Sequence, residues 1–194
     1  MNDMESSTIP PPSSADDDDG MVLLEPLNNP DLAAKILGIR HNSAGVDGLQ
    51  LRGVRGLDGR AWRRLGCILG KSFYVKTLAI DDCHLNVSEL CVGLQNNRCI
   101  ERLNLNNNNI SDVDLDHLIL SLKKNKNMNL LALINNRIGV RGCTSLAQLL
   151  GNRKSNLQYL YLNGNRINDE SVVILAKSLA KNTKLQRLDL RGNN

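Results

Sequence analysis

Apolar residues recur in a fixed arrangement from Val46 to the last residue of the chain. Six segments share the pattern φxxφxφxxNxφ, in which φ is apolar and N is usually asparagine. Successive segments start 29, 25, 28, 29 and 28 residues apart. A period held over five intervals indicates an internal repeat, whose units bury their apolar faces against one another. The segments start at Val46, Val75, Ile100, Met128, Leu157 and Leu185.

Each repeat combines two periodicities. Its first half alternates apolar and polar residues, as in Leu160-Tyr161-Leu162, and this predicts a short strand with one buried face. Its second half spaces apolar residues by three and four, which predicts a helix. One βα unit is therefore copied along the chain. The inward helical positions are Val87, Leu90, Cys91 and Leu94; Leu115, Leu118 and Leu122; Cys143, Leu146, Ala147 and Leu150; and Val172, Leu175, Ala176 and Leu179.

In four of the six repeats an asparagine follows the predicted strand at the same offset, where the chain must leave the sheet, and Cys83 holds this position in the second repeat. A buried amide there can donate to and accept from peptide groups that the bend leaves unpaired, so we expect a structural ladder. Val54 holds this position in the first repeat, which we expect to be the least regular one. The predicted ladder residues are Cys83, Asn108, Asn136, Asn165 and Asn193.

The segments ahead of the repeats differ in composition. Residues 1–20 contain three consecutive prolines, several serines and the run Asp16 to Asp19, which predicts a disordered acidic tail. Residues 21–45 are more apolar and contain a helix start at Asn29-Pro30-Asp31, with Gly38 as the expected helix end. We expect this segment to cap the first repeat, and residues 46–194 to form the repeat domain.

Composition and charge agree with a repeated packing unit. Leucine accounts for 34 of the 194 residues, whereas only 3% are aromatic. The net charge is +4, but residues 1–20 carry six acids and no base, so residues 21–194 carry 24 basic and 14 acidic groups, a net of +10. The acidic tail could fold back onto this basic body, or remain solvated.

The cysteines and the lack of a long apolar run bear on location. The five cysteines are odd in number and form no CxxC pair, which argues against a disulfide framework and for a reducing compartment. The sequence has no run of ~18 apolar residues and no secretory signal. We therefore expect a cytoplasmic protein, with the nucleus as an alternative.

These repeats resemble a known family. The stretch LQYLYLNGNRINDESVVILAKSLAKNTK is similar to the 28-residue leucine-rich repeat of ribonuclease inhibitor, which also occurs in the C-terminal arrays of NOD-like receptors, Ran GTPase-activating proteins and tropomodulins. The resemblance covers residues 46–194. It implies an α/β fold, a right-handed βα solenoid in a horseshoe arc with a parallel sheet on the concave face and helices on the convex face. It does not imply a ligand, because ligands differ among these relatives.

Catalysis, metal binding and cofactor binding are weakly supported. Cys83 and His84 could form a nucleophile pair, but the ladder position predicts a buried, inert thiol. Asp112, Asp114 and Asp116 resemble calcium ligands, yet they lack the glycine and closing glutamate of a calcium loop, and they lie where a helix begins. We therefore expect no enzyme activity, no metal and no cofactor.

The outward strand positions carry the most information about function. Alternation directs apolar residues and tyrosines toward the concave surface in the fourth and fifth repeats, between polar repeats on either side. An apolar centre with a polar rim and with Tyr and Arg side chains is typical of a protein-binding surface, although ordinary cross-strand packing is the alternative. The predicted binding residues are Leu130, Ala132, Ile134, Tyr159, Tyr161, Asn163, Arg187, Asp189 and Arg191.

Three other hypotheses stay open at this point. One is a GTPase-activating protein of the Ran type, although the acidic run lies at the opposite end from the one expected. Another is binding of an anionic surface or nucleic acid through basic helix ends, such as Lys123, Lys124 and Lys126. Finally, the last repeat lacks a helix, so the chain is expected either to be a fragment or to self-associate through this uncapped end.

Overall fold

The computed structural model describes residues 29–194. The predicted acidic tail of residues 1–20, and residues 21–28 of the capping segment, lie outside this part. Helices and strands alternate throughout. They are α1 (Pro30–Arg40), β1 (Gly48–Arg52), α2 (Gly59–Lys71), β2 (Thr77–Asp81), α3 (Val87–Leu94), β3 (Arg102–Asn104), α4 (Asp112–Leu122), β4 (Leu130–Ala132), α5 (Val140–Gly151), β5 (Tyr159–Tyr161), α6 (Asp169–Leu179) and β6 (Arg187–Asp189).

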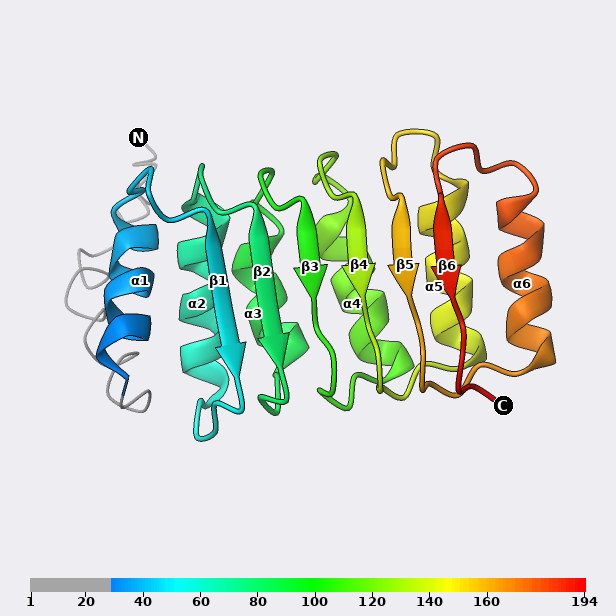
Figure 1. Cartoon of the computed structure of the whole chain (residues 1–194), viewed down its shortest axis with the longest axis horizontal. Helices are drawn as coiled ribbons and strands as arrows, with labels where there is room; N and C mark the ends of the chain where they lie inside the picture. The colour runs from blue at the N-terminus through cyan, green and yellow to red at the C-terminus, as the bar shows by residue number, and fades with distance from the viewer. Residues whose placement is uncertain (1–28) are drawn as a thin grey trace, which may run out of the picture.

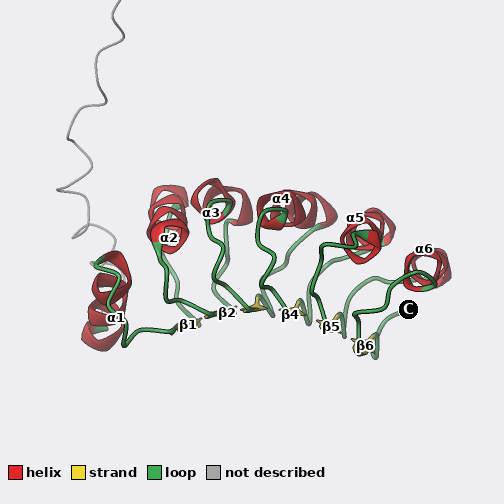
Figure 2. Cartoon of the chain, turned by 90° about the horizontal axis from the view of Figure 1, so that it is seen from above, coloured by secondary structure: helices red, strands yellow, loops and turns green. Residues whose placement is uncertain are grey.

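The strands form one parallel sheet in which each strand pairs with its neighbours in sequence, in the order β1-β2-β3-β4-β5-β6. Figure 2 shows the sheet on the inner side of a shallow arc and the helices on the outer side. The arc follows from the unequal spacing of the two layers. Neighbouring strands lie about 4.8 Å apart, and neighbouring helices need more space along the solenoid, so the helical layer is the longer one. The predicted βα solenoid is therefore confirmed.

The core lies between the sheet and the helices. Each inner strand contributes buried leucines, such as Leu103 and Leu105 of the third repeat, both 0% exposed. The facing helix contributes its i, i+3 and i+7 positions, as Leu115, Leu118 and Leu122 do in α4. At the N-terminal end, α1 packs against α2 and buries Leu32, Ile36 and Ile39.

The asparagines after the strands form a hydrogen-bonded ladder along one edge of the sheet. The Oδ1 of Asn136 accepts from the backbone N–H groups of Asn108 (3.2 Å) and Ile110 (2.9 Å), and its Nδ2 donates to the carbonyl of Leu105 at 3.0 Å. Asn108, Asn165 and Asn193 make equivalent bonds. Each amide thus joins consecutive repeats and leaves few buried peptide groups unpaired.

The first repeat differs from the expectation. Its strand β1 has five residues and pairs along its full length with β2, and its helix α2 has 13 residues, so neither element is irregular. The irregularity is confined to the loop after β1, where Gly53 and Gly56 have positive φ angles of 62° and 83°. Val54, at the ladder position, contributes no side-chain hydrogen bond.

A second set of asparagines at the opposite edge was not predicted. The side chains of Asn97, Asn125 and Asn182 accept hydrogen bonds from the backbone N–H two and three residues later, just before the next strand. The Nδ2 of Asn97 also donates to the Leu69 carbonyl of the preceding repeat, at 2.7 Å. The signal was present in the sequence, since these asparagines precede three of the repeat starts by three residues.

Glycines allow α2 and α3 to approach closely, next to the second repeat, which is only 25 residues long. A Cβ on Gly93 of α3 would lie 2.1 Å from the backbone nitrogen of Cys67 in α2, and one on Gly66 would lie 2.1 Å from the Leu90 carbonyl oxygen. A Cβ on Gly38 of α1 would lie 2.9 Å from the Cγ2 of Val46, a side-chain atom in the loop between α1 and β1. The expectation that Gly38 ends α1 is wrong, because the helix continues to Arg40.

The outer side of α6 departs from the predicted burial. Val172 is 43% exposed, and Ala176 is also exposed, although the equivalent Cys143 of α5 is fully buried. In the inner repeats, this position is covered by the helix of the following repeat, as α6 covers Cys143 of α5. Within residues 29–194 no helix follows α6, so Val172 and Ala176 stay exposed. Within residues 29–194, no helix is long and apolar enough to cross a membrane.

Candidate functional site

The candidate site is the concave surface formed by β4, β5 and β6. The register places Leu130 beside Tyr159 and Tyr159 beside Arg187, and in the next outward row it places Ala132, Tyr161 and Asp189 side by side. A third row follows just beyond the strands. There the N–H of Asn135 donates to the carbonyl of Asn163 at 2.8 Å, and that of Gly164 to the carbonyl of Arg191 at 3.0 Å. The three repeats therefore present their predicted residues on one continuous surface, and those of the third row are Ile134, Asn163 and Arg191.

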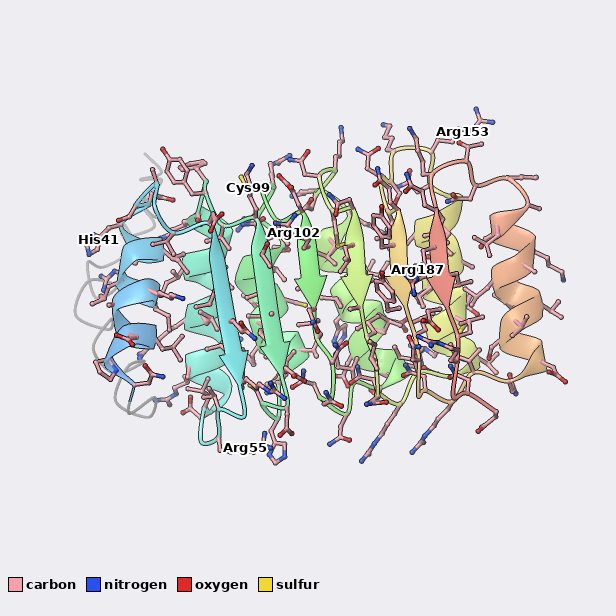
Figure 3. The ribbon with its side chains drawn as sticks, in the orientation of Figure 1. His41, Arg55, Cys99, Arg102, Arg153 and Arg187 are labelled. Carbon is pink, nitrogen blue, oxygen red and sulfur yellow. The ribbon has the colours of Figure 1, made fainter. Side chains whose placement is uncertain are left out.

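The two tyrosines lie at the centre of this surface and are half-buried. The Tyr159 hydroxyl donates to the Oε1 of Gln186 at 3.1 Å. The guanidinium carbon of Arg187 lies 5.4 Å from the centroid of the Tyr161 ring, within the range of a cation–π interaction. Both rings therefore have partners that limit their rotation, so that little side-chain entropy remains to be lost on binding. Figure 3 shows Arg187 over the sheet at this end and Arg102 near its middle.

Asp189 organises the arginines of the last strand. Its carboxylate accepts from Arg191 Nε at 2.9 and 3.1 Å and from Nη2 at 2.7 Å, and Arg187 Nη2 lies 4.0 Å away. Hydrogen bonds from Arg191 and Asn163 hold the pKa of Asp189 well below its usual range. The two arginine side chains nevertheless stay largely in solvent, with exposed fractions of 58% and 79%.

Two predicted binding residues need correction. Ala132 is only 5% exposed, because its small side chain lies between those of Asn104 and Tyr161 in the same row. Asp189 is only 7% exposed, because the arginines cover it. Neither residue can offer much surface to a partner. Ala132 forms the floor of the surface, and Asp189 positions the arginines.

The outward rows on β1, β2 and β3 are more polar. They include an ion pair between Arg52 and Asp81 at 3.7 Å and a hydrogen bond from Arg102 Nε to the Thr77 hydroxyl at 3.1 Å. The Oδ1 of Asn106 accepts from the backbone N–H of Ile134 at 2.8 Å, which fixes the boundary between the polar and apolar parts. The apolar centre therefore begins at β4.

The residues considered for catalysis have structural roles. Cys83 is 2% exposed, its thiol donates to the Asp81 carbonyl at 3.1 Å, and burial raises its pKa. His84 is exposed and points away from the core with its backbone at φ 48°. A thiol held protonated in the ladder is a poor nucleophile. Burial similarly raises the pKa of Cys143 to about 11.

The three acidic residues at the start of α4 each have a partner within the repeat array. Asp114 completes a capping box with Ser111, and Asp112 Oδ1 accepts from the backbone N–H of Gly139 at 2.7 Å. Asp116 forms an ion pair with Arg141 at 2.8 Å. Asp112 and Asp116 therefore tie α4 to the start of α5, and Asp114 caps α4 itself. Among the described residues, no group of three or more His, Cys, Asp or Glu side chains could hold a metal ion.

Comparisons with known proteins agree with this architecture. A family model described as Leucine Rich repeat matches residues 96–118, 153–176 and 181–194. The mouse "NACHT, LRR and PYD domains-containing protein 5" is 29% identical over 172 residues, which are 87% of this chain and 15% of that protein. The "Protein phosphatase 1 regulatory subunit 37 homolog" of Caenorhabditis briggsae is 36% identical over 109 residues, which are 54% of this chain and 12% of that protein. The chain thus spans less than one sixth of either relative.

Solved structures show the same fold at lower identity. Actin-binding site 2 of leiomodin-1 superposes with a TM-score of 0.57 at 16% identity, covering 77% of this chain and 90% of that one. Internalin C2 from Listeria monocytogenes gives a TM-score of 0.55 at 23% identity, covering 89% and 78% of the two chains. The repeat pattern, the βα units and these similarities agree, and the chain is a leucine-rich-repeat solenoid whose repeats resemble those of the ribonuclease-inhibitor type.

Proposed function

We propose that this chain is a protein-binding scaffold and that it binds its partner on the concave surface of β4, β5 and β6. The observation that carries the proposal is the placement of Tyr159 and Tyr161 in register between Leu130 on one side and Arg187 on the other. Tyrosine and arginine dominate binding energy at many interfaces, because they combine a large apolar area with polar ends.

The rigidity of this surface supports the proposal. Backbone hydrogen bonds and the asparagine ladder fix the strands, and Gln186 and Arg187 restrain the two rings. A partner would then lose little affinity to ordering of the scaffold. Ile134 and Leu130 add apolar area beside the rings, and Arg187 and Arg191 supply a basic rim suited to an acidic side chain of the partner.

The relatives support the same class of function without identifying a partner. One relative is named as a regulatory subunit of a protein phosphatase, a role that requires binding to another protein. The similarity to leiomodin-1 concerns the fold alone. The described residues add no support to a Ran-type GTPase-activating role. We also propose that the chain acts inside the cell, since the cysteines of the described residues are free thiols. We further propose that it is not an enzyme; in support, burial raises the pKa of Cys83, the thiol considered as a nucleophile.

Affinity capture with matched variants tests this proposal. Tyr159→Ala combined with Tyr161→Ala removes both rings from the concave surface. Val113→Ala combined with Leu120→Ala removes two apolar side chains of α4, which are 47% and 56% exposed on the convex face. We expect the tyrosine variant to lose the proteins that the wild type captures, whereas the α4 variant keeps them.

The capture should be quantified by mass spectrometry, and both variants should first show unchanged helical circular dichroism. The α4 variant removes apolar area of a similar kind, so it controls for nonspecific adhesion. Retained capture by the tyrosine variant, or equal loss in both variants, would contradict binding through the concave surface.

A further inference from the structure

One edge of the solenoid is strongly basic. It is formed by the loops that lead from each helix to the next strand, residues 41–47, 72–76, 95–101, 123–129, 152–158 and 180–186, and we call it the basic edge. These loops contain nine Lys or Arg residues and two acidic ones, Asp47 and Glu101. The loops of the opposite edge, residues 53–58, 82–86, 105–111, 133–139, 162–168 and 190–194, contain four Lys or Arg residues and two acidic ones. Positive charge is therefore concentrated along one side.

The basic side chains are free to meet a ligand. All nine are exposed, and within residues 29–194 only Lys76 of the nine forms an ion pair, with Glu101 at 3.4 Å. The last three loops hold seven of the nine and have no acidic residue. Helix dipoles account for only part of the pattern, because Lys123 is the C-cap residue of α4 whereas Lys126 and Lys154 lie beyond the ends of α4 and α5.

Two aromatic side chains project from the same edge. Phe73 is 73% exposed and Tyr74 is 43% exposed. Their loop is nevertheless fixed, since the N–H of Phe73 donates to Asn42 Oδ1 at 3.0 Å and the N–H groups of Tyr74 and Val75 donate to the Ser72 hydroxyl at 3.4 and 3.3 Å. A fixed backbone therefore presents both rings to solvent at the basic edge.

The basic edge also contains a crevice between the C-terminal ends of α4 and α5. Its volume is about 90 Å³. Leu122, Met128 and Leu149 contribute apolar lining, and Lys123, Lys126 and Lys154 are the basic residues that line it. The crevice therefore combines apolar atoms with three lysines that have no acidic partner in the described structure.

We propose that the basic edge binds the surface of a bilayer that contains anionic phospholipids. Its lysines contact the phosphoryl and carboxylate groups, the crevice takes one headgroup, and Phe73 and Tyr74 enter the polar interface. Each basic residue near such a surface adds to the attraction, and aromatic rings favour the headgroup region.

The shape of the edge favours a bilayer over a nucleic acid. Figure 2 looks down on this edge and shows the loops distributed along the whole solenoid, an arrangement that a broad surface can contact at once. Seven of the nine basic residues are lysines, whereas bidentate recognition of nucleic acid phosphates favours arginine. The contact surface is separate from the concave tyrosines, so the proposal is independent of the proposed function.

Vesicle sedimentation tests the proposal. The wild-type chain should bind vesicles of phosphatidylcholine with 30 mol% phosphatidylserine at low salt, and should not bind vesicles of phosphatidylcholine alone. The variant Lys123→Gln, Lys126→Gln, Lys154→Gln should bind about 100-fold more weakly, since each charge near the surface contributes roughly five-fold. The matched control Arg60→Gln, Arg137→Gln, Arg166→Gln changes the net charge equally at exposed sites away from the basic edge, and it should bind like the wild type.

A second variant reports contact directly. Phe73→Trp places an indole at the edge, and its fluorescence should be quenched by brominated lipids in the anionic vesicles, whereas the buried Trp62 should not respond. Equal weakening in the lysine variant and the control would overturn the proposal, as would absent quenching. It would also be overturned if an RNA oligonucleotide or polyglutamate bound the chain while the anionic vesicles did not.

Discussion

Replacing Asn136 with alanine isolates the contribution of the asparagine ladder. The side chain of Asn136 is 7% exposed and makes four hydrogen bonds to backbone groups of two repeats. Alanine removes all four bonds at once. The N–H groups of Asn108 and Ile110 and the carbonyl of Leu105 then lose this partner in a region where those residues are at most 4% exposed.

The magnitude follows from the cost of leaving buried backbone groups unpaired. Each such group costs about 1–3 kcal/mol. Three groups, with some relief from water entering the space of the amide, give a loss of about 3–5 kcal/mol in the free energy of unfolding. A single domain has a total stability of about 5–15 kcal/mol, so the variant should lose a large part of it.

Urea denaturation followed by circular dichroism measures this loss. Asn156→Ala is the control, because Asn156 is exposed and donates one hydrogen bond, to the Lys126 carbonyl at 2.7 Å. We expect a change below about 1 kcal/mol for this control. Asn136→Cys should fall between the two, since a thiol can replace one of the four bonds. A loss below about 1 kcal/mol for Asn136→Ala would show that the ladder amide contributes little to the stability of the solenoid.

Three further predictions concern packing, pH and thiol chemistry. Gly93→Ala should destabilise the chain by at least about 3 kcal/mol in the same urea assay, because the alanine Cβ would overlap the α2 backbone. Gly151→Ala is the control and should change stability by less than about 1 kcal/mol, because a Cβ at position 151 has no atom within 4 Å. Because the pKa of Asp189 is lowered by folding, its contribution to stability is present above the unfolded value near 4 and is lost as the pH falls below it. Thermal unfolding from pH 6 to pH 2 should therefore show a smaller decrease for Asp189→Asn than for the wild type, and parallel curves would exclude this contribution. At pH 8 a disulfide reagent should modify the exposed Cys67 and leave Cys143, whose pKa is raised to about 11, unmodified until denaturant is added; mass spectrometry of the labelled peptides would show the opposite order if the account is wrong.

The features that recur with the period could be predicted from sequence. The positions of strand, ladder and helix residues recur in several repeats of one chain. A repeat with an unclear pattern can therefore be assigned by alignment with the other repeats. The leucines of the strands and Asn108, Asn136, Asn165 and Asn193 therefore lie where the pattern places them. The second asparagine set recurs less regularly, since Ser72 and Lys154 hold the position in two repeats, and this hides its signal.

Features that depend on contact between repeats were less accessible. The burial of Ala132 depends on the size of the side chains beside it in the sheet, and that of Asp189 on how two arginines fold over it. The close approach of Gly66 and Gly93 depends on the distance between two helices. The exposure of Val172 depends on what covers α6. None of these quantities is encoded within a single repeat.

A photo-crosslinking amino acid at position 161 would show directly whether a protein partner contacts the concave surface. Such a probe replaces Tyr161 on β5 in one variant and Leu120 on the convex side of α4 in the other, and each is irradiated in an extract of the source cell. We expect protein adducts at position 161 that decrease when unlabelled wild-type chain is added as competitor, and few adducts at position 120. Adducts confined to position 120, or equal at both positions, would contradict binding through the concave surface.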